Sequence, residues 1–161
     1  MKLARESTPV QIRHIYISAG HAFIGRHGSA SGIHPMSEVD CVECLAGRGL
    51  AGDRFLDYRL NYWGQITFFT QENYDRLCRE LNVHDKSPAA FRRNVITSGI
   101  DLNALIGQEF EIQGVRFLGR QECTPCYWMD RAFAPGAEKL LRNEGGLRAT
   151  ILTNGILHVM R

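Results

Sequence analysis

The five cysteines are the residues of this sequence best suited to chemistry, and four of them form two Cys-x-x-Cys pairs. The pairs are Cys41-Val-Glu-Cys44 and Cys123-Thr-Pro-Cys126. Such pairs suit a structural zinc site, a dithiol redox pair, or a single thiolate that ligates a cofactor metal. Zinc ribbons separate their pairs by roughly 15–20 residues, whereas 78 residues lie between Cys44 and Cys123. Cys41 and Cys44 also fall in a strand-like stretch that would point them to opposite faces, so zinc stays open only as an alternative.

A redox pair of the thioredoxin kind needs a helix directly after its first cysteine, within a βαβ unit. The residues around Cys123 have the pattern of β-hairpins instead, and a proline lies inside the pair. We therefore favour Cys126 alone, because a rigid Thr-Pro turn after a strand is suited to presenting a thiolate. Three arginines lie nearby in the sequence and can stabilise that anion: Arg116, Arg120 and Arg131. The other cysteines are expected to be buried as small apolar residues: Cys41, Cys44 and Cys78.

The basic residues point to an anionic ligand. Of 19 Lys and Arg residues, only three are lysine, and arginine binds phosphate or carboxylate in a two-pronged manner that lysine does not. Genomic base composition also shifts lysine to arginine, so position matters more than number. The arginines of interest lie in Gly-rich loops or at the ends of elements: Arg26 beside His27, Arg54, Arg92 and Arg148. Because neither a P-loop nor a G-x-G-x-x-G motif is present, an ordinary nucleotide site is not indicated.

Length and charge narrow the class of protein. A chain of 161 residues is expected to form one domain over residues 1–161. The net charge of +2 is too close to neutral for a dedicated nucleic-acid-binding protein. No apolar run approaches the ~18 residues that a membrane span needs, and the first residues become polar too early for a signal peptide. We therefore expect a cytoplasmic protein with neither nucleic acid nor membrane as a partner.

The elements that must position these residues are mostly strands. Strands are predicted over 10–18, 38–46, 64–69, 95–97, 109–112, 115–118, 147–153 and 156–159. Helices are predicted over 71–81 after the cap Thr70, from Ser87-Pro88 to 92, for a turn or two after Asp101, and over 137–143. Residues 113–114 make a hairpin turn, and the last two strands are expected to pair around Asn154-Gly155. The prediction is a mostly β fold with inserted short helices, as a closed or partly open β-barrel.

Five segments, in this order, resemble the MOSC domain family, named after the C-terminal domain of molybdenum-cofactor sulfurases. The segments are Gly49-Leu-Ala-Gly-Asp-Arg54, Phe91-Arg-Arg-Asn-Val95, Leu105-Ile-Gly107, Glu122-Cys-Thr-Pro-Cys126 and Gly146-Leu-Arg-Ala-Thr-Ile-Leu152. The resemblance extends from about Val10 to the end of the sequence. Within the family, the sequence is similar to small stand-alone bacterial members. The family commonly has His after Gly-Asp-Arg, where this chain has Phe55, so any role of that His is lost or moved.

The resemblance implies a β-barrel-like fold and one functional cysteine, Cys126, as a ligand of molybdenum held by molybdopterin. It further implies that Arg54, Arg92, Asn94 and Arg148 hold the pterin phosphate, with Arg26 and His27 as further anion-binding candidates. Asp53 is expected to brace one of these arginines. The family also carries an association with pyridoxal phosphate.

Three functions remain open at this point. The first is oxygen-atom transfer at molybdenum, such as the reduction of N-hydroxylated compounds, with separate electron-donor proteins because the sequence shows no flavin or iron–sulfur module. The second is a sulfur carrier that forms a persulfide on Cys126 and passes sulfur to an acceptor. The third is a non-enzymatic module that binds an anion or zinc.

Overall fold

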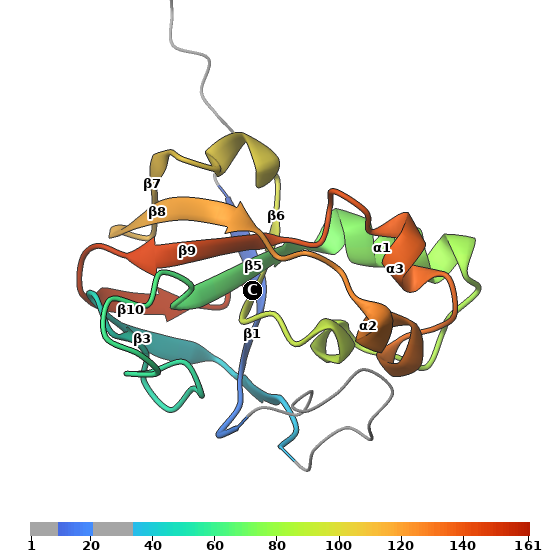
Figure 1. The fold of residues 1–161 in the computed structure, drawn as a ribbon, viewed down its shortest axis with the longest axis horizontal. Helices are drawn as coiled ribbons and strands as arrows, with labels where there is room; N and C mark the ends of the chain where they lie inside the picture. Colours follow the sequence, from blue (N-terminus) through green and yellow to red (C-terminus); the bar gives the residue numbers. More distant parts are fainter. Residues whose placement is uncertain (1–9, 21–33) are drawn as a thin grey trace, which may run out of the picture.

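The computed structural model describes residues 10–20 and 34–161. Within them the strands form two sheets (Figure 1). The larger sheet has the order β2-β1-β6-β5-β9-β8-β7. Its strands are β1 (Gln11–Ile17), β2 (Ser37–Val39), β5 (Ile66–Thr70), β6 (Val95–Ser98), β7 (Glu109–Ile112), β8 (Val115–Glu122) and β9 (Leu147–Ile151). The smaller sheet has the order β10-β3-β4 and consists of β3 (Cys41–Leu45), β4 (Gly49–Leu50) and β10 (Gly155–His158).

Three α-helices gather at one end of the sheets (Figure 1). They are α1 (Gln71–Glu80), α2 (Tyr127–Ala132) and α3 (Ala137–Leu140), and two 3₁₀ helices, η1 (Pro88–Phe91) and η2 (Asn103–Leu105), complete the described helices. The predicted caps are confirmed: the Thr70 side chain accepts a hydrogen bond from the Asn73 N–H, and the Ser87 side chain from the Ala89 N–H. Helix α2 was not predicted, although it follows Cys126 directly.

The mostly β composition with short helices is confirmed. Of the predicted closed or partly open barrel, the closed form is wrong, because the larger sheet does not close on itself. The larger sheet has two separate edges, β2 and β7, and the described strands do not pair across them. Strand β2 has only three residues, and Glu109 and Glu111 of β7 are exposed. Short strands and charged side chains at an edge disfavour further pairing.

The predicted pairing of the last two strands is also wrong. β9 lies between β5 and β8 in the larger sheet, whereas β10 pairs with β3 in the smaller one. The side chain of Asn154, between them, accepts a hydrogen bond from the Ala46 N–H at 2.7 Å. This contact holds the crossing chain against the end of β3, so the Asn-Gly pair connects two sheets rather than forming a hairpin.

The core has two parts, one on each face of the central strand β5, whose five residues are all buried. Phe68 packs in the part shared by the two sheets, and Phe69 in the part between the larger sheet and the helices. Because β5 pairs parallel to β6, the chain must cross over between them, and α1 and η1 lie on that crossover. The crossover brings the segment after η1 to the end of the sheet near α2.

One polar contact secures the outer edge of the smaller sheet. The Gln113 side chain, at the tip of the β7–β8 hairpin, donates to the His158 carbonyl at 2.9 Å and accepts from the His158 N–H at 2.8 Å. Gln113 itself has a positive φ of 52°, as does Gly114 at 81°, which is the backbone that the predicted two-residue turn requires. The hairpin thereby reaches from one sheet to the other.

Candidate functional site

A cavity of about 230 Å³ lies where the segments after β4, η1 and β8 meet. Its walls contain Cys126, four arginines and several apolar side chains: Arg54, Phe55, Ala90, Phe91, Arg92, Arg93, Thr124, Cys126, Trp128, Met129 and Arg148. These wall residues include no carboxylate and no histidine. The cavity therefore combines a thiol with an excess of positive charge, and it brings together four of the residues that the sequence singled out.

Cys126 reaches this cavity because the chain turns sharply between β8 and α2. Cys126 has an extended backbone (φ −137°, ψ 176°) and its carbonyl accepts the Met129 N–H at 2.9 Å, so it is the N-cap residue directly before α2. Cys126 is exposed, whereas Cys123 is only 1% exposed and is not part of the cavity wall. A reagent in the cavity can thus reach the second thiol of the pair but not the first.

The arginines around the thiol differ from those expected from sequence proximity. Arg116 pairs with Glu109 on the β7–β8 hairpin, and Arg131 stacks over the Trp128 ring with its guanidinium carbon 5.3 Å from the ring centre. Arg116, Arg120 and Arg131 are all absent from the cavity wall. The arginines that do line it come from segments far away in the sequence.

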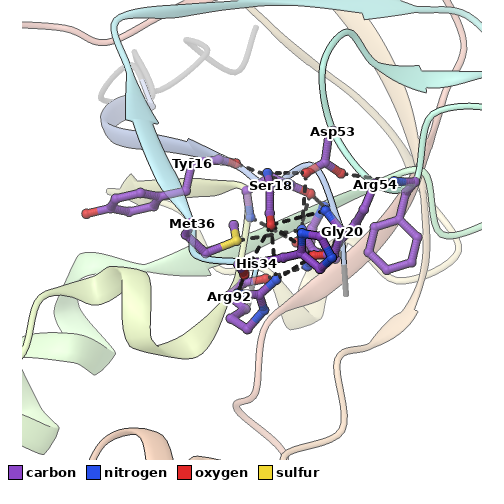
Figure 2. A network of polar contacts seen from close by, with 11 residues as sticks. Tyr16, Ser18, Gly20, His34, Met36, Asp53, Arg54 and Arg92 are labelled. Atoms are coloured by element: carbon purple, nitrogen blue, oxygen red, sulfur yellow. Dashed lines mark hydrogen bonds and ion pairs between the residues drawn. The ribbon is translucent and has the colours of Figure 1, made fainter. Parts of the chain in front are cut away.

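Arg54 is held in place by the acid that precedes it. The Arg54 side chain is 7% exposed, and its Nη1 lies 3.1 Å from Oδ1 of Asp53, which has no exposed side-chain surface. The same Asp53 oxygen accepts the Ser18 N–H at 3.0 Å, and Arg54 Nη2 donates to the Arg92 carbonyl at 3.1 Å (Figure 2). Burial lowers the pKa of Arg54, and the charge of Asp53 opposes that shift. Asp53 is therefore the expected brace.

Arg92 ties the η1 segment to the end of β1. Its guanidinium donates to the Ser18 Oγ at 3.2 Å, to the Gly20 carbonyl at 2.9 Å and to the His34 carbonyl at 2.7 Å (Figure 2). Burial, and then the positive charge of Arg54, lowers the pKa of Arg92 to about 10. Two further candidates of the anion site, Arg26 and His27, lie outside the described residues.

Arg93 is a site residue that the sequence analysis did not select. It donates to three carbonyls: Nε to Gly145 at 2.9 Å, Nη1 to Phe91 at 2.8 Å and Nη2 to Cys123 at 3.3 Å. A Cβ on Gly145 would lie 2.0 Å from the Cys123 carbonyl oxygen, so only glycine permits the segments around residues 123 and 145 to approach this closely. Arg93 thus clamps the turn that carries Cys126. The sequence feature that could have identified Arg93 as a site residue is its position inside the family segment Phe91-Arg-Arg-Asn-Val95.

Arg148, on β9, has a buried donor with no acceptor. Within residues 10–20 and 34–161, its Nε atom finds no hydrogen-bond partner. The guanidinium carbon lies 5.8 Å from the centre of the Trp63 ring. A buried donor of this kind is costly unless a ligand or water satisfies it. Arg148 is therefore the cavity arginine with the strongest requirement for an added acceptor.

Asn94 is not brought to the cavity. It is fully buried, and from its place just before β6 its side chain bonds to β5 and β1. Its Oδ1 accepts from the N–H and the hydroxyl of Thr67, both at 3.0 Å, and its Nδ2 donates to the Tyr16 carbonyl at 3.1 Å. The side chain thus braces the sheet in this structure and lies apart from the cavity wall.

The other cysteines lie away from the cavity. Cys44 is buried as expected, Cys78 is only half-buried, and the expectation is wrong for Cys41, which is exposed. Cys41 and Cys44 therefore point to opposite sides of β3, as the strand pattern predicted. In the part of the chain that the structure describes, no three His, Cys, Asp or Glu side chains lie close enough to hold a metal ion, so the two cysteine pairs do not converge there.

Known proteins share the sequence pattern and the fold. The sequence model of the MOSC domain matches residues 58–158. No curated protein sequence matches the chain. The crystal structure of the YuaD protein from Bacillus subtilis is similar, with a TM-score of 0.66 at 16% identity over 92% of this chain and 94% of YuaD. That of YiiM from Geobacillus stearothermophilus has a TM-score of 0.64 at 13% identity, over 93% of this chain and 71% of YiiM. Among the described residues, no helix is long and apolar enough to cross a membrane.

Proposed function

The chain belongs to the MOSC domain family, and on that premise we propose that its cavity binds a molybdenum–molybdopterin cofactor, with the Cys126 thiolate as a ligand of the metal and oxygen-atom transfer as the reaction. The observation that carries this proposal is the meeting of Cys126 with four arginines in one cavity, where the described wall residues include no carboxylate. The reduction of N-hydroxylated compounds is a reaction of this type.

The chemistry of the cavity walls fits such a group. A thiolate is a soft ligand of the kind that transition metals accept, and arginine binds phosphate in two-pronged hydrogen bonds. The buried Nε of Arg148, which has no acceptor in the described chain, supports a role for this residue in binding the phosphate. Arg54 and Arg92 contribute charge, while many of their donors are already used by Asp53, Ser18 and backbone carbonyls.

In this proposal the residues of the chain bind, position and shield. Arg93 fixes the turn that carries Cys126 through its bond to the Cys123 carbonyl, so the sulfur is presented in one place. Trp128 and Met129 of α2 form an apolar part of the wall, which limits the access of water and strengthens the arginine–anion interactions. When bound, molybdenum supplies the oxygen-atom transfer chemistry. Because the reduction of an N-hydroxylated compound, with release of its oxygen as water, consumes two electrons and two protons, we propose separate electron-donor proteins for that reaction and a small-molecule substrate.

Elemental analysis tests the proposal directly. The protein is produced in a host that makes the cofactor, and molybdenum is measured per chain for the natural sequence, Cys126→Ser and Cys41→Ser. Cys41 is also exposed but lies outside the cavity, so it is the matched control. We expect molybdenum in the natural protein and in Cys41→Ser, and its loss in Cys126→Ser. Absence of molybdenum from the natural protein would refute the proposal.

The small size of the cavity favours a second candidate, a sulfur carrier. Pockets for drug-sized ligands span about 300–1,000 Å³, and this cavity measures about 230 Å³. A persulfide on Cys126 adds only one atom. It would form when the Cys126 thiolate attacks the outer sulfur of a donor persulfide and the donor thiolate leaves, and the arginines would stabilise the persulfide anion until an acceptor arrives. Mass spectrometry is expected to show an added sulfur that thiol reductant removes and that Cys126→Ala lacks. If the added sulfur persists in Cys126→Ala but disappears in Cys123→Ala, the carrier residue is Cys123 and the assignment to Cys126 is wrong.

If neither molybdenum nor sulfur is found, anion binding without catalysis remains as the third function.

A further inference from the structure

The segment of residues 55–63, called here the aromatic loop, holds an apolar side chain in solvent. It connects β4 to β5, and Leu60 within it is 94% exposed. The loop is nonetheless well fixed: Arg48 forms two bonds to Asp57, at 2.9 and 2.6 Å, and the Tyr62 N–H donates to the Arg59 carbonyl at 3.2 Å. Because the loop is already ordered before a partner binds, association loses less conformational entropy than it would with a flexible loop.

The rings of the aromatic loop pack against one another. Phe55 and Tyr62 stack with centres 5.6 Å apart, and Tyr58 meets Tyr62 edge to face at 5.0 Å. The Arg59 guanidinium lies over the Tyr58 ring at 5.0 Å. Ring faces that are occupied in this way are poor platforms for stacking nucleic-acid bases. Leu60 has no ring face to offer, so the exposed part of the loop suits an apolar pocket of another protein.

The electrostatics of this face select the kind of partner. Two acids of the segment between β4 and β5 are paired with arginines, Asp53 with Arg54 and Asp57 with Arg48. Within the described chain, no carboxylate pairs with Arg59. Phe55, at the start of the loop, also lines the cavity with its four arginines. Because Asp53 already balances the charge of Arg54, the positive charge of the loop and the cavity wall comes from residues such as Arg59, Arg93 and Arg148. A positive face of this kind attracts an acidic partner.

We propose that the aromatic loop is the docking surface for an acidic electron-donor protein, with Leu60 inserted in an apolar pocket and Arg59 paired with carboxylates at its rim. The docking of an acidic protein rests on the loop itself, while the partner's role as electron donor rests on the proposed function. Arginine and aromatic residues beside an apolar anchor are the composition of energetically important interface centres. Docking here would place the donor beside the cavity, because Phe55 belongs to both the loop and the cavity wall.

Site-directed photo-crosslinking tests this surface in the native host. A benzophenone amino acid replaces Leu60 in one variant and Ile106 in the other, and the full chain is used. Ile106 is also exposed, at 40%, but it lies between η2 and β7 and not on the cavity wall. We expect position 60 to link to one acidic protein that contains a flavin or iron–sulfur centre, and position 106 not to do so.

The linked protein is then purified, and its dissociation constant is measured with cofactor-free chain, so that the readout does not depend on molybdenum. We expect Leu60→Ser and Arg59→Glu to weaken binding at least about tenfold, and association to slow between about 0.01 M and 0.3 M salt. Ile106→Ser is expected to bind as the natural chain does, and circular dichroism confirms that each variant is folded.

The outcomes separate the two proposals. An acidic partner without a redox centre would support the docking surface and overturn the donor role. Crosslinks to nucleic acid, the same partners at both positions, or no crosslink at position 60 would overturn the docking surface, even where the protein contains molybdenum. Equal affinity of the natural chain and Leu60→Ser would overturn it as well.

Discussion

Replacement of Asn94 by alanine decides whether this residue braces the sheet or holds a cofactor. The substitution removes the acceptor of the Thr67 N–H and the donor to the Tyr16 carbonyl, in a fully buried position. Each buried polar group left without a partner costs roughly 1–3 kcal/mol, so Asn94→Ala is expected to lower the free energy of unfolding by about 2–6 kcal/mol. For a domain of this size, that corresponds to a fall in Tm of at least about 4 °C.

Urea unfolding followed by fluorescence measures this change, with Asn103→Ala as the matched control. The Asn103 side chain makes one hydrogen bond, to the Asn143 carbonyl, at an exposed position, so its loss is expected to cost less than about 1 kcal/mol. Cofactor content relative to folded protein is expected to stay unchanged in Asn94→Ala. A loss of stability below about 1 kcal/mol together with a loss of bound molybdenum would refute the brace and support a role in binding.

Three further predictions concern other parts of the molecule. Gly146→Ala places a Cβ 2.3 Å from a backbone carbonyl of β5 at a φ of 112°, so soluble yield and Tm should fall well below those of Gly107→Ala, which has open space at a φ of 77°. Phosphate should raise the Tm of the natural chain and of Arg142→Met but not of Arg148→Met, and equal shifts in all three would remove Arg148 from the anion site. Burial raises the pKa of Cys44 to about 12 from 9.0; because the unfolded chain releases that proton first, the free energy of unfolding should fall as pH rises from 9 towards 12, and less steeply in Cys44→Ala.

The elements with strong local signals were predicted well. The turn at 113–114, the cap at Thr70 and the strand at β5 depend on a few neighbouring residues, and the structure confirms them. Helix α2 has only six residues, too few to be stable alone, so its formation depends on packing that sequence patterns do not report. The separation of β9 from β10 likewise depends on which sheet each strand joins.

The candidate site was predicted only in part, because local sequence motifs identify its residues but tertiary packing decides which of them meet. Arg54, Arg92, Arg148 and Cys126 occupy family motifs, and the fold brings all four to one cavity. Neighbouring residues in the chain, such as Arg92, Arg93 and Asn94, look equivalent in sequence yet point to different surroundings. The backbone of Arg92 is left-handed, with φ 55°, and this conformation sets the directions of the side chains that follow. No sequence pattern predicts a left-handed backbone at this arginine.

The bond between Gln113 and His158 has a consequence for the behaviour of the protein in solution. A strand at the edge of a sheet presents free N–H and C=O groups that recruit strands of other molecules, which is a route to aggregation. The Gln113 amide uses one of its N–H donors and its carbonyl oxygen, as a peptide group would, and thereby occupies both backbone groups of His158. One side chain thus occupies the backbone groups of His158 at the β10 edge of the smaller sheet, so this position cannot pair with a strand of a neighbouring molecule.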